Sequence, residues 1–321
     1  MANVYHIPAM LTETIEGLNI KPDGVYVDVT FGGGGHSRAI LRRMDEIKNE
    51  KLKIKNCGQL FSFDQDADTV TNAIDDERWT FVHSNFRFLR NWMDYYGVEG
   101  IDGLLADLGV SFHHFDCPER GFSFRFSAPL DMRMNQTAKR TAADIVNGYS
   151  EEELAKVLWL YGELKNGRQV AKNICKARAQ KPILRTEELV EVAYPHPLPK
   201  RRGVEIEVPA QYKKDLARMF QALRIEVNDE MGALREMLVA ARDLLKPGGR
   251  IAILTYHSLE DRLVKNFLRS GNLEGTIEKD FYGNALTPFD VIEKGREASA
   301  DEVERNPRSR SAKLRVAEKK S

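Results

Sequence analysis

The sequence predicts an α/β protein built on a doubly wound, mostly parallel sheet, and three observations predict it. Strand-like and helix-like segments alternate over residues 25–108, which is the pattern of a parallel sheet covered by helices. Four consecutive glycines, Gly32 to Gly35, connect the first strand to the first helix, as at a nucleotide-binding turn. Residues 116–212 read as helical, and the alternation returns after them. We therefore expect an α/β core, residues 1–115 and 213–321, interrupted by an inserted all-helical domain at 116–212.

Each expected strand of the first half is a short apolar run that a helical segment follows. The expected strands are 25–29, 60–64, 79–83 and 103–108, and the expected helices are 37–48, 67–74 and 86–95. In the insertion, Ser150 is an N-cap with an acidic first turn, and further helices are expected at 168–179 and 186–193. A long amphipathic helix over 215–245, a strand at 250–256, a helix at 259–268 and an edge strand around 312–316 complete the expected core.

The composition fits a soluble protein of the cytoplasm. The 48 basic and 48 acidic residues balance, so the net charge points neither toward nucleic acid nor away from it. No apolar run reaches the roughly 18 residues that span a bilayer, and the first residues lack the layout of a signal peptide. Cys57, Cys117 and Cys175 show neither disulfide nor metal-ligand spacing. We expect reduced thiols and no membrane partner.

The glycine turn is more specific than the fold class. A dinucleotide-binding G-x-G-x-x-G motif needs a glycine where Ser37 stands and no acid inside the preceding strand. Here Asp28 ends that strand, so a dehydrogenase is disfavoured. An acid in the strand followed by glycines resembles the first motif of S-adenosylmethionine-dependent methyltransferases, with Thr30 where their first glycine often stands. The alternative is a turn that only joins a strand tightly to a helix.

Two further acids end predicted strands, on the side where doubly wound sheets bind their ligands. Asp64 ends the second strand and can accept the ribose hydroxyls of a nucleoside, or it can cap the following helix, as Asp66 can. Asp107 ends the fourth strand, where a methyl acceptor would lie, or it starts a turn with Gly109. Phe86, after the third strand, is either one wall of an adenine pocket or part of the core.

Several later segments, in collinear order, make the resemblance specific to one family. They are Asp107-Leu-Gly-Val-Ser111, Arg120-Gly-Phe-Ser-Phe124, Pro129-Leu-Asp-Met-Arg-Met134, Phe220-Gln-Ala-Leu-Arg-Ile225 with Asn228, Tyr256-His-Ser-Leu-Glu-Asp-Arg262 and Asn306-Pro-Arg-Ser-Arg-Ser-Ala-Lys-Leu-Arg315. With His6-Ile-Pro and the glycine turn, they resemble the RsmH (MraW) family from about His6 to Val316. Members of that family methylate the exocyclic N4 amine of a cytidine in the decoding centre of bacterial small-subunit ribosomal RNA.

The resemblance implies a Rossmann-like class I methyltransferase core and S-adenosyl-L-methionine as the cofactor. It also implies small-subunit ribosomal RNA, naked or within the small ribosomal subunit, as the partner, and it leaves a homodimer open. The family's cofactor positions correspond to Gly34, Gly35, His36, Asp64, Phe86, Asp107 and His114. At the last position the family usually has Gln, within Val-Ser-Ser-Pro-Gln, whereas this chain reads Val110-Ser-Phe-His-His114. An imidazole can still donate a hydrogen bond there.

In methyl transfer to a cytosine amine, an oxygen that accepts an amine hydrogen stabilises the positive charge that develops on nitrogen. Asp107 is the candidate for this catalytic role. His257 and Asp261, four residues apart, are either a polar pair that reaches the target base or a local bond that caps the helix. The same spacing is half a metal site, but no third ligand is apparent, so no metal is assigned.

The target base needs a stacking surface, and the RNA backbone needs cations. Aromatic and arginine side chains crowd the loop after Asp107, and they form either a base platform or buried anchors of the loop: Phe112, Phe115, Phe122, Phe124 and Arg125. For phosphate contacts we expect 200–202 and the arginines of 305–315. Two other functions stay open: a DNA amino-methyltransferase, whose usual Pro-Pro-Tyr type motif does not match here, and an assembly factor that binds S-adenosylmethionine without catalysis.

Overall fold

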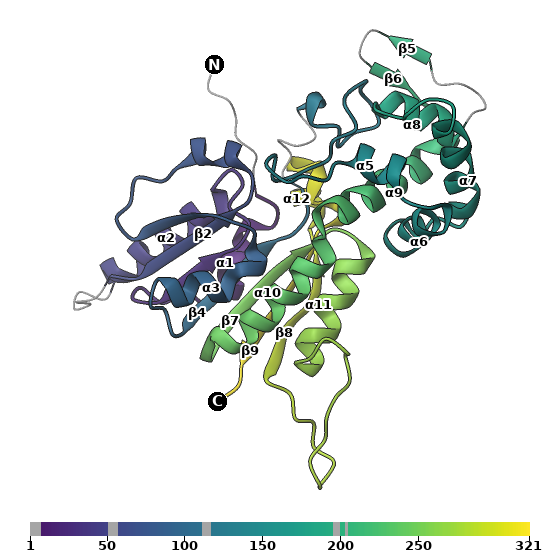
Figure 1. The fold of residues 1–321 in the computed structure, drawn as a ribbon. Coiled ribbons are helices and arrows are strands. Elements are labelled where there is room, and N and C mark those ends of the chain that lie inside the picture. The colour runs from purple at the N-terminus through teal and green to yellow at the C-terminus, as the bar shows by residue number, and fades with distance from the viewer. Residues whose placement is uncertain (1–7, 51–56, 111–116, 195–199, 203–204) are drawn as a thin grey trace. The chain divides into compact units, whose positions relative to one another are not determined.

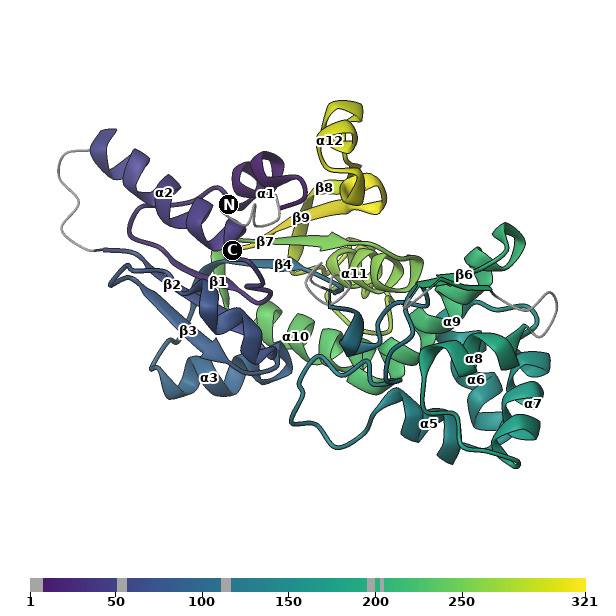
Figure 2. The ribbon, with the colours of Figure 1, turned by 90° about the horizontal axis from the view of Figure 1, so that it is seen from above.

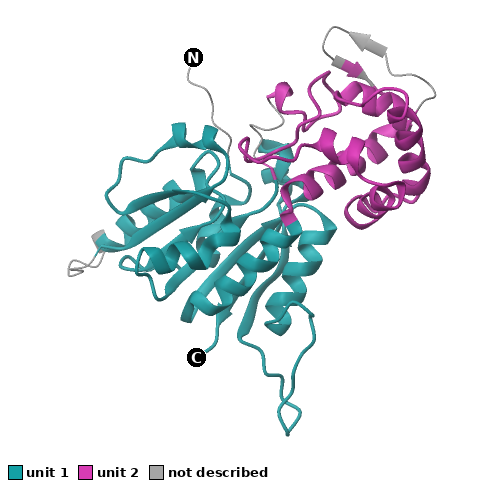
Figure 3. Ribbon diagram, viewed as in Figure 1, with its two compact units in different colours: residues 1–109, 231–321 teal, residues 110–230 magenta. Residues whose placement is uncertain are grey.

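The computed structural model describes residues 8–50, 57–110, 117–194, 200–202 and 205–321, and its ribbon is drawn in Figure 1. The chain forms two compact units, coloured separately in Figure 3. Unit 1 consists of residues 1–109 and 231–321, and unit 2 consists of residues 110–230. The chain therefore leaves unit 1 once, after residue 109, and returns to it once, after residue 230.

Unit 1 is built around a mixed sheet in which seven strands are described. Its strand order is β3-β2-β1-β4-β7-β9-β8. The strands are β1 Val25–Asp28, β2 Gln59–Asp64, β3 Trp79–His83, β4 Ile101–Asp107, β7 Leu245–Thr255, β8 Phe289–Glu297 and β9 Lys313–Lys319. β3, β2, β1, β4 and β7 pair in parallel, and β9 pairs antiparallel with both β7 and β8. The predicted doubly wound, mostly parallel sheet of a Rossmann-like core is confirmed.

Helices cover both faces of this sheet. They are α1 Leu11–Leu18, α2 Gly35–Glu50, α3 Leu89–Tyr95, α10 Glu230–Leu244, α11 Ser258–Ser270 and α12 Ala300–Arg305, with the 3₁₀ helices η1 Ala67–Asn72, η2 Phe86–Phe88 and η4 Pro307–Ser311. In Figure 2, α1 and α2 lie on one face, and α3 and α10 lie on the other. Ile40 and Met44 of α2 pack against strand residues such as Leu60, Leu105 and Leu254. Burial on both faces explains why the central strands read as continuous apolar runs.

Unit 2 is mainly helical. Its elements are η3 Pro118–Arg120, α5 Ala142–Gly148, α6 Glu151–Gly162, α7 Gly167–Arg178, α8 Thr186–Ala193 and α9 Ala210–Asn228, with a two-stranded sheet of β5 Lys200–Arg202 and β6 Glu205–Glu207. Ser150 caps α6 in a reciprocal capping box with Glu153, as its acidic first turn predicted. Leu154 and Leu158 of α6 share one apolar core with residues of α7 and α9.

The long helix expected over 215–245 is two helices instead. Asp229 has φ 46°, a left-handed conformation, and it separates α9 from α10. The buried face of α9, including Leu216, Phe220 and Leu223, joins the core of unit 2. The structural boundaries at 110 and 230 therefore differ from the expected 116 and 212. Amphipathic spacing continues through both helices, so the pattern did not reveal that their apolar faces belong to different cores.

Two other expectations at the level of elements are wrong. The strand expected at an edge around 312–316 is β9, which lies between β7 and β8 inside the sheet. The edge is β8, which we did not predict, because in Phe289–Glu297 only Phe289 is buried and five of the other eight residues are charged. Charged side chains are common on edge strands, where they block pairing with another chain. The helix expected at 67–74 is only the short 3₁₀ helix η1. Among the described residues, none of the helices combines the length and apolar content needed to cross a membrane.

Candidate active site

The carboxyl ends of the parallel strands of unit 1 bring four polar side chains to one edge of the sheet. Asp28, Asp64 and Asp107 end β1, β2 and β4, and Tyr256 directly follows β7. Since these strands are neighbours in the order β2-β1-β4-β7, side chains that are far apart in sequence become adjacent. Ligands of doubly wound folds bind outside this edge.

The glycine turn begins directly after β1, and its glycines have different structural reasons. Gly32 and Gly34 have φ 50° and 74°, values that favour glycine. A Cβ atom at Gly34 would lie 2.9 Å from the Phe31 ring, and one at Gly35 would lie 2.2 Å from Cγ of Pro8. At Gly32 a Cβ would meet no described atom within 4 Å. Packing therefore requires Gly34 and Gly35, whereas Gly32 faces open space beside the turn.

Asp64 ties the glycine turn to the end of β2. Its carboxylate accepts hydrogen bonds from the backbone N–H groups of Gly32 and Asp66, both at 2.9 Å. The cap of η1 is Asp66, whose side chain accepts a hydrogen bond from the N–H of Asp68 at 3.1 Å. The helix-capping alternative for Asp64 is therefore taken by Asp66. Asp64 is only partly buried, and carboxylate oxygens are acceptors of the kind that hydroxyl ligands require.

Ser37, at the position where a dinucleotide fingerprint would have glycine, donates a side-chain hydrogen bond to Asp28. Asp28 is fully buried, and it accepts a 2.7 Å hydrogen bond from the Ser37 hydroxyl and a 3.0 Å bond from the N–H of Thr30. Burial raises the pKa of Asp28, and the His36 ring and the bond from Ser37 oppose this. A buried carboxyl group needs such partners, since leaving it unpaired is costly.

Asp107 is held from several sides. Its backbone N–H donates to Oγ1 of Thr30 at 2.6 Å, and its Oδ1 accepts a 2.6 Å bond from the hydroxyl of Tyr256. Nδ1 of His36 lies 3.8 Å from Oδ2, and 24% of the Asp107 side chain stays exposed. Burial raises the pKa of Asp107 to about 7; the bond from Tyr256 opposes this rise, and the Glu260 carboxylate adds to it. The pKa of Asp107 thus lies near neutral pH, as expected of a group that accepts and releases a proton during catalysis.

His36 is an enclosed, neutral ring. Only 4% of the residue is exposed, and its Nε2 has no hydrogen-bond partner among the described residues. Burial lowers the pKa of His36, and the Asp28 carboxylate opposes this. Burial therefore favours the neutral form of the ring that lies beside Asp107. A buried nitrogen without a partner at this position leaves one polar group that a ligand or a water can satisfy.

The structure does not bring His257 and Asp261 together. His257 is the N-cap of α11: its Nδ1 accepts from the N–H of Glu260 at 3.4 Å, and its Nε2 lies 3.0 Å from Oε1 of Glu260. Asp261 forms a bidentate pair with Arg315 at 2.8 and 3.0 Å. Burial alone would raise the pKa of Asp261, but Arg315 outweighs it and the net shift is downward. The capping alternative describes His257, and Asp261 joins α11 to β9.

The expected base platform is described only in part. Phe122 is 5% exposed in the core of unit 2, and Phe124 packs edge-on against Phe220 at 5.7 Å, so both are buried or half-buried anchors of their loop. Arg125 is exposed. Residues 111–116, which contain the expected His114, Phe112 and Phe115, lie outside the described residues, as do the side chains of 200–202. Phe86 begins η2 and is half-buried, which fits either of its two expected roles.

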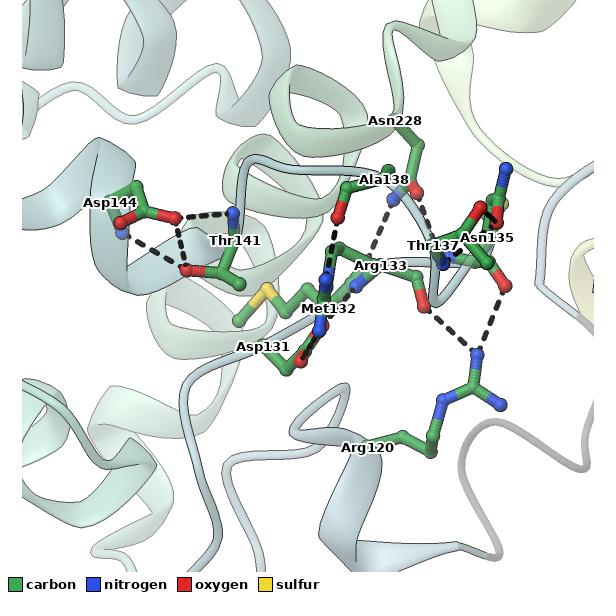
Figure 4. A network of polar contacts seen from close by, with 11 residues as sticks. Arg120, Asp131, Met132, Arg133, Asn135, Thr137, Ala138, Thr141, Asp144 and Asn228 are labelled. Atoms are coloured by element: carbon green, nitrogen blue, oxygen red, sulfur yellow. Dashed lines mark hydrogen bonds and ion pairs between the residues drawn. The ribbon is translucent and has the colours of Figure 1, made fainter.

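The loop that carries the resemblance motifs of unit 2 is fixed by a polar network (Figure 4). The guanidinium of Arg120 donates to the carbonyls of Arg133 and Met134 at 2.9 and 3.1 Å. Arg133 in turn pairs with Asp131 at 2.7 Å, and Oδ1 of Asn228 accepts from the N–H of Met134 at 2.8 Å. Arg120, near the start of unit 2, and Asn228, near its end, thus both hydrogen-bond to the backbone of this loop. Among the predicted phosphate contacts, Arg315 is instead buried and engaged by Asp261.

Sequence reasoning assigned no role to Thr30 or Tyr256 at this site. Both contact Asp107, Thr30 from the turn after β1 and Tyr256 from the residue after β7, and no local spacing links them. One signal was present for Tyr256: it is the first residue after a parallel strand, the same position that drew attention to acids. Extending that rule from carboxylates to hydroxyls at strand ends would have found it.

The comparisons with known proteins cover nearly the full chain. A family model described as the MraW methylase family matches residues 3–320. A protein of Phocaeicola vulgatus named Ribosomal RNA small subunit methyltransferase H is 56% identical over 318 residues, which are 99% of this chain and 98% of that protein. Proteins of the same name from Parabacteroides distasonis and Bacteroides thetaiotaomicron are 57% and 55% identical; each alignment covers 98% of this chain, with 97% and 98% of those proteins. The helical unit is thus included in the similarity.

Proposed function

The chain belongs to the MraW methylase family, and on that premise we propose that it transfers a methyl group from S-adenosylmethionine to the exocyclic N4 amine of a cytidine in the decoding centre of small-subunit ribosomal RNA. The name shared by relatives at 55–57% identity supports the class of substrate. One observation carries the reaction: a partly exposed carboxyl group, Asp107, lies at the end of β4 beside the glycine turn and accepts a hydrogen bond from the Tyr256 hydroxyl.

The residues at the sheet edge fit the proposed cofactor. The open space at Gly32 allows a ligand to approach the turn closely, and Asp64 beside it can accept ribose hydroxyls. Phe86 is proposed as one wall for the adenine ring, and His36 as a neutral neighbour of the reacting group. Gly34 and Gly35 shape the turn rather than face the open space. When bound, S-adenosylmethionine supplies a methyl group activated by the positive charge on its sulfur.

Asp107 is proposed to act on the amine. The lone pair of a cytosine amine is delocalised into the ring, so the nitrogen becomes nucleophilic only as it pyramidalises. A carboxylate oxygen that accepts an amine hydrogen stabilises the positive charge that then develops. As the new N–C bond forms and the C–S bond breaks, the displaced electron pair goes to sulfur. The proton of the amine passes to Asp107, directly or through a water. Positioning of the two reactants accounts for much of such a rate enhancement.

Unit 2 is proposed to recognise the RNA substrate, either naked or within the small ribosomal subunit. His257 and Asp261 have partners within unit 1 that explain them, so we give them structural roles and leave Asp107 as the catalytic residue.

The test is methyl transfer from labelled S-adenosylmethionine to small ribosomal subunits that lack the modification, followed by nucleoside analysis. We expect label in N4-methylcytidine. Naked ribosomal RNA and DNA are assayed in parallel, so label only in DNA would favour a DNA amino-methyltransferase. Cofactor binding without transfer to any of the three would contradict catalysis and favour the assembly-factor alternative.

A further inference from the structure

The acceptor carboxylate makes its shortest side-chain contact with a tyrosine. The Tyr256 hydroxyl donates to Oδ1 of Asp107 at 2.6 Å, from the residue that follows β7 to the residue that ends the adjacent β4. The same tyrosine is fixed through its backbone, whose N–H donates to Oε2 of Glu260 at 3.1 Å. Glu260 lies on the first turn of α11 and is only 3% exposed. The donor is thus held by a strand end and a helix start.

We propose that Tyr256 is the positioning residue for methyl transfer: its hydroxyl holds Oδ1 of Asp107 and so leaves Oδ2 to accept the hydrogen of the target amine. This inference rests on the proposed function and names a residue that acts through Asp107. Two other residues lie against Asp107, one at its backbone and one near its carboxylate. The backbone of Asp107 is pinned by Thr30, and the ring of His36 lies near Oδ2 without a hydrogen bond, at 3.8 Å. Only Tyr256 donates a side-chain hydrogen bond to Asp107 among the described contacts.

The bond also has an electrostatic consequence. Two carboxyl groups face Asp107 within unit 1: Glu260, whose charge raises its pKa, and Asp28, whose own pKa is raised by the charge of Asp107. The His36 ring, whose own pKa is lowered by burial, makes no hydrogen bond to Asp107. The bond donated by Tyr256 lowers the pKa of Asp107 against burial and these charges. Losing that donor therefore disfavours the ionised form, which is the form that accepts a proton.

The first test is Tyr256→Phe, which removes one oxygen and keeps the ring. We expect S-adenosylmethionine affinity close to wild type, a single-turnover methylation rate lower by about tenfold at neutral pH, and an acid limb of the pH–rate profile moved to higher pH. Tyr149→Phe is the matched control, because the Tyr149 hydroxyl also donates to a carboxylate, Glu226, at 2.6 Å but within unit 2. Its acid limb should not move. An equal rate loss at every pH, or no loss, would overturn the proposal.

A second variant changes only the strength of the donor. Replacing Tyr256 by 3-fluorotyrosine makes the hydroxyl more acidic at almost constant shape, so we expect the acid limb to move to lower pH, opposite to Tyr256→Phe. A purely structural tyrosine would leave it unmoved, which would again overturn the proposal.

A readout without turnover separates this proposal from the proposed function. The carboxyl band of Asp107, assigned in infrared difference spectra against Asp107→Asn, reports its ionisation directly. We expect its midpoint to rise in Tyr256→Phe. If wild type methylates subunits but the midpoint does not move, the role of Tyr256 is refuted alone. If wild type methylates nothing while the midpoint moves, the proposed function fails and the positioning role of Tyr256 fails with it.

Discussion

At the scale of single residues, the site is governed by how burial acts on each ionisable group. Burial raises the pKa of Asp107 and Asp28 and lowers that of His36, so each group is driven toward its neutral form. Hydrogen bonds donated to the two carboxyl groups lower their pKa and so favour their ionised forms. The pKa of Asp107 is raised to about 7 because burial and the Glu260 charge raise it more than the hydrogen bond from Tyr256 lowers it. A group in that range can both accept a proton and release it.

Asp107→Asn tests the catalytic charge. We expect S-adenosylmethionine binding to persist and the methylation rate to fall by about 10²- to 10⁴-fold, because an amide is a weaker acceptor and cannot take a proton. Asp102→Asn is the control on the same strand, where Asp102 pairs with Lys21 and Lys246 at the other end of β4. Equilibrium dialysis and single-turnover transfer give the two readouts. Near-normal turnover in Asp107→Asn would eliminate a catalytic carboxylate at this position.

Asp261 tests the structural role that we assign to its ion pair with Arg315. Its pKa is lowered in the folded protein, so the stability it contributes is present above its unfolded value and is lost as the pH falls through the folded one. We expect Asp261→Asn to lower the free energy of unfolding by about 1.5–3 kcal/mol near pH 7, because Arg315 is only 8% exposed and loses its charged acceptor. In urea unfolding, the difference in free energy of unfolding between wild type and Asp261→Asn should shrink below about pH 4. A gap that is independent of pH would contradict the ion pair.

At the scale of elements, two glycines of the glycine turn are expected to differ in role: Gly34 in stability and Gly32 in cofactor binding. Gly34→Ala places a Cβ against the Phe31 ring in a left-handed conformation, so we expect a loss of at least about 2 kcal/mol in the free energy of unfolding. Gly32→Ala meets no described atom, so only the backbone cost of about 1 kcal/mol applies. Its methyl group enters the space proposed for the cofactor, so affinity for S-adenosylmethionine should fall about tenfold or more.

Gly97→Ala is the matched control for the glycine turn. Gly97 has φ 69° and open space around it, but it follows α3, away from the turn. Its backbone cost should equal that of Gly32→Ala, and cofactor affinity should stay unchanged. Calorimetric binding and thermal unfolding of the three variants give the comparison. Wild-type affinity in Gly32→Ala would place the cofactor away from Gly32.

The elements themselves show what could be predicted from the sequence. The strand over 79–83 and the helix over 186–193 have the predicted bounds, because short apolar runs and capped amphipathic turns are local signals. The acids at strand ends were found for the same reason. Tyr256, Thr30 and the Asp261–Arg315 pair were not, because their meaning depends on which strands become neighbours. Neighbour order is set by packing over the whole sheet, which no single segment encodes.

At the scale of the whole molecule, the chain passes from one unit to the other at two points. The first lies just after the proposed acceptor residue, and the second lies just after a residue with left-handed backbone. The first crossing, after residue 109, comes two residues beyond Asp107. The second, after residue 230, comes one residue beyond Asp229 and its left-handed backbone. The helical unit is therefore attached directly to the strand that ends in the proposed acceptor. An insertion at that point can change substrate recognition without altering the strands that form the glycine turn.

The division at 110 and 230 predicts that unit 2 folds by itself and that the shorter segment does not. The apolar cluster of unit 2 lies within 110–230, and α9 contributes Leu216, Met219, Phe220, Ala222, Leu223 and Val227 to it. A fragment of residues 110–230 should show helical circular dichroism and a cooperative thermal transition. A fragment of 116–212, the insertion expected from the sequence, lacks the buried face of α9 and leaves its partners on α6 exposed, so it should unfold without cooperativity. Equal cooperativity in both fragments would show that the core of unit 2 does not need α9, and would favour residue 212 as the end of the inserted domain.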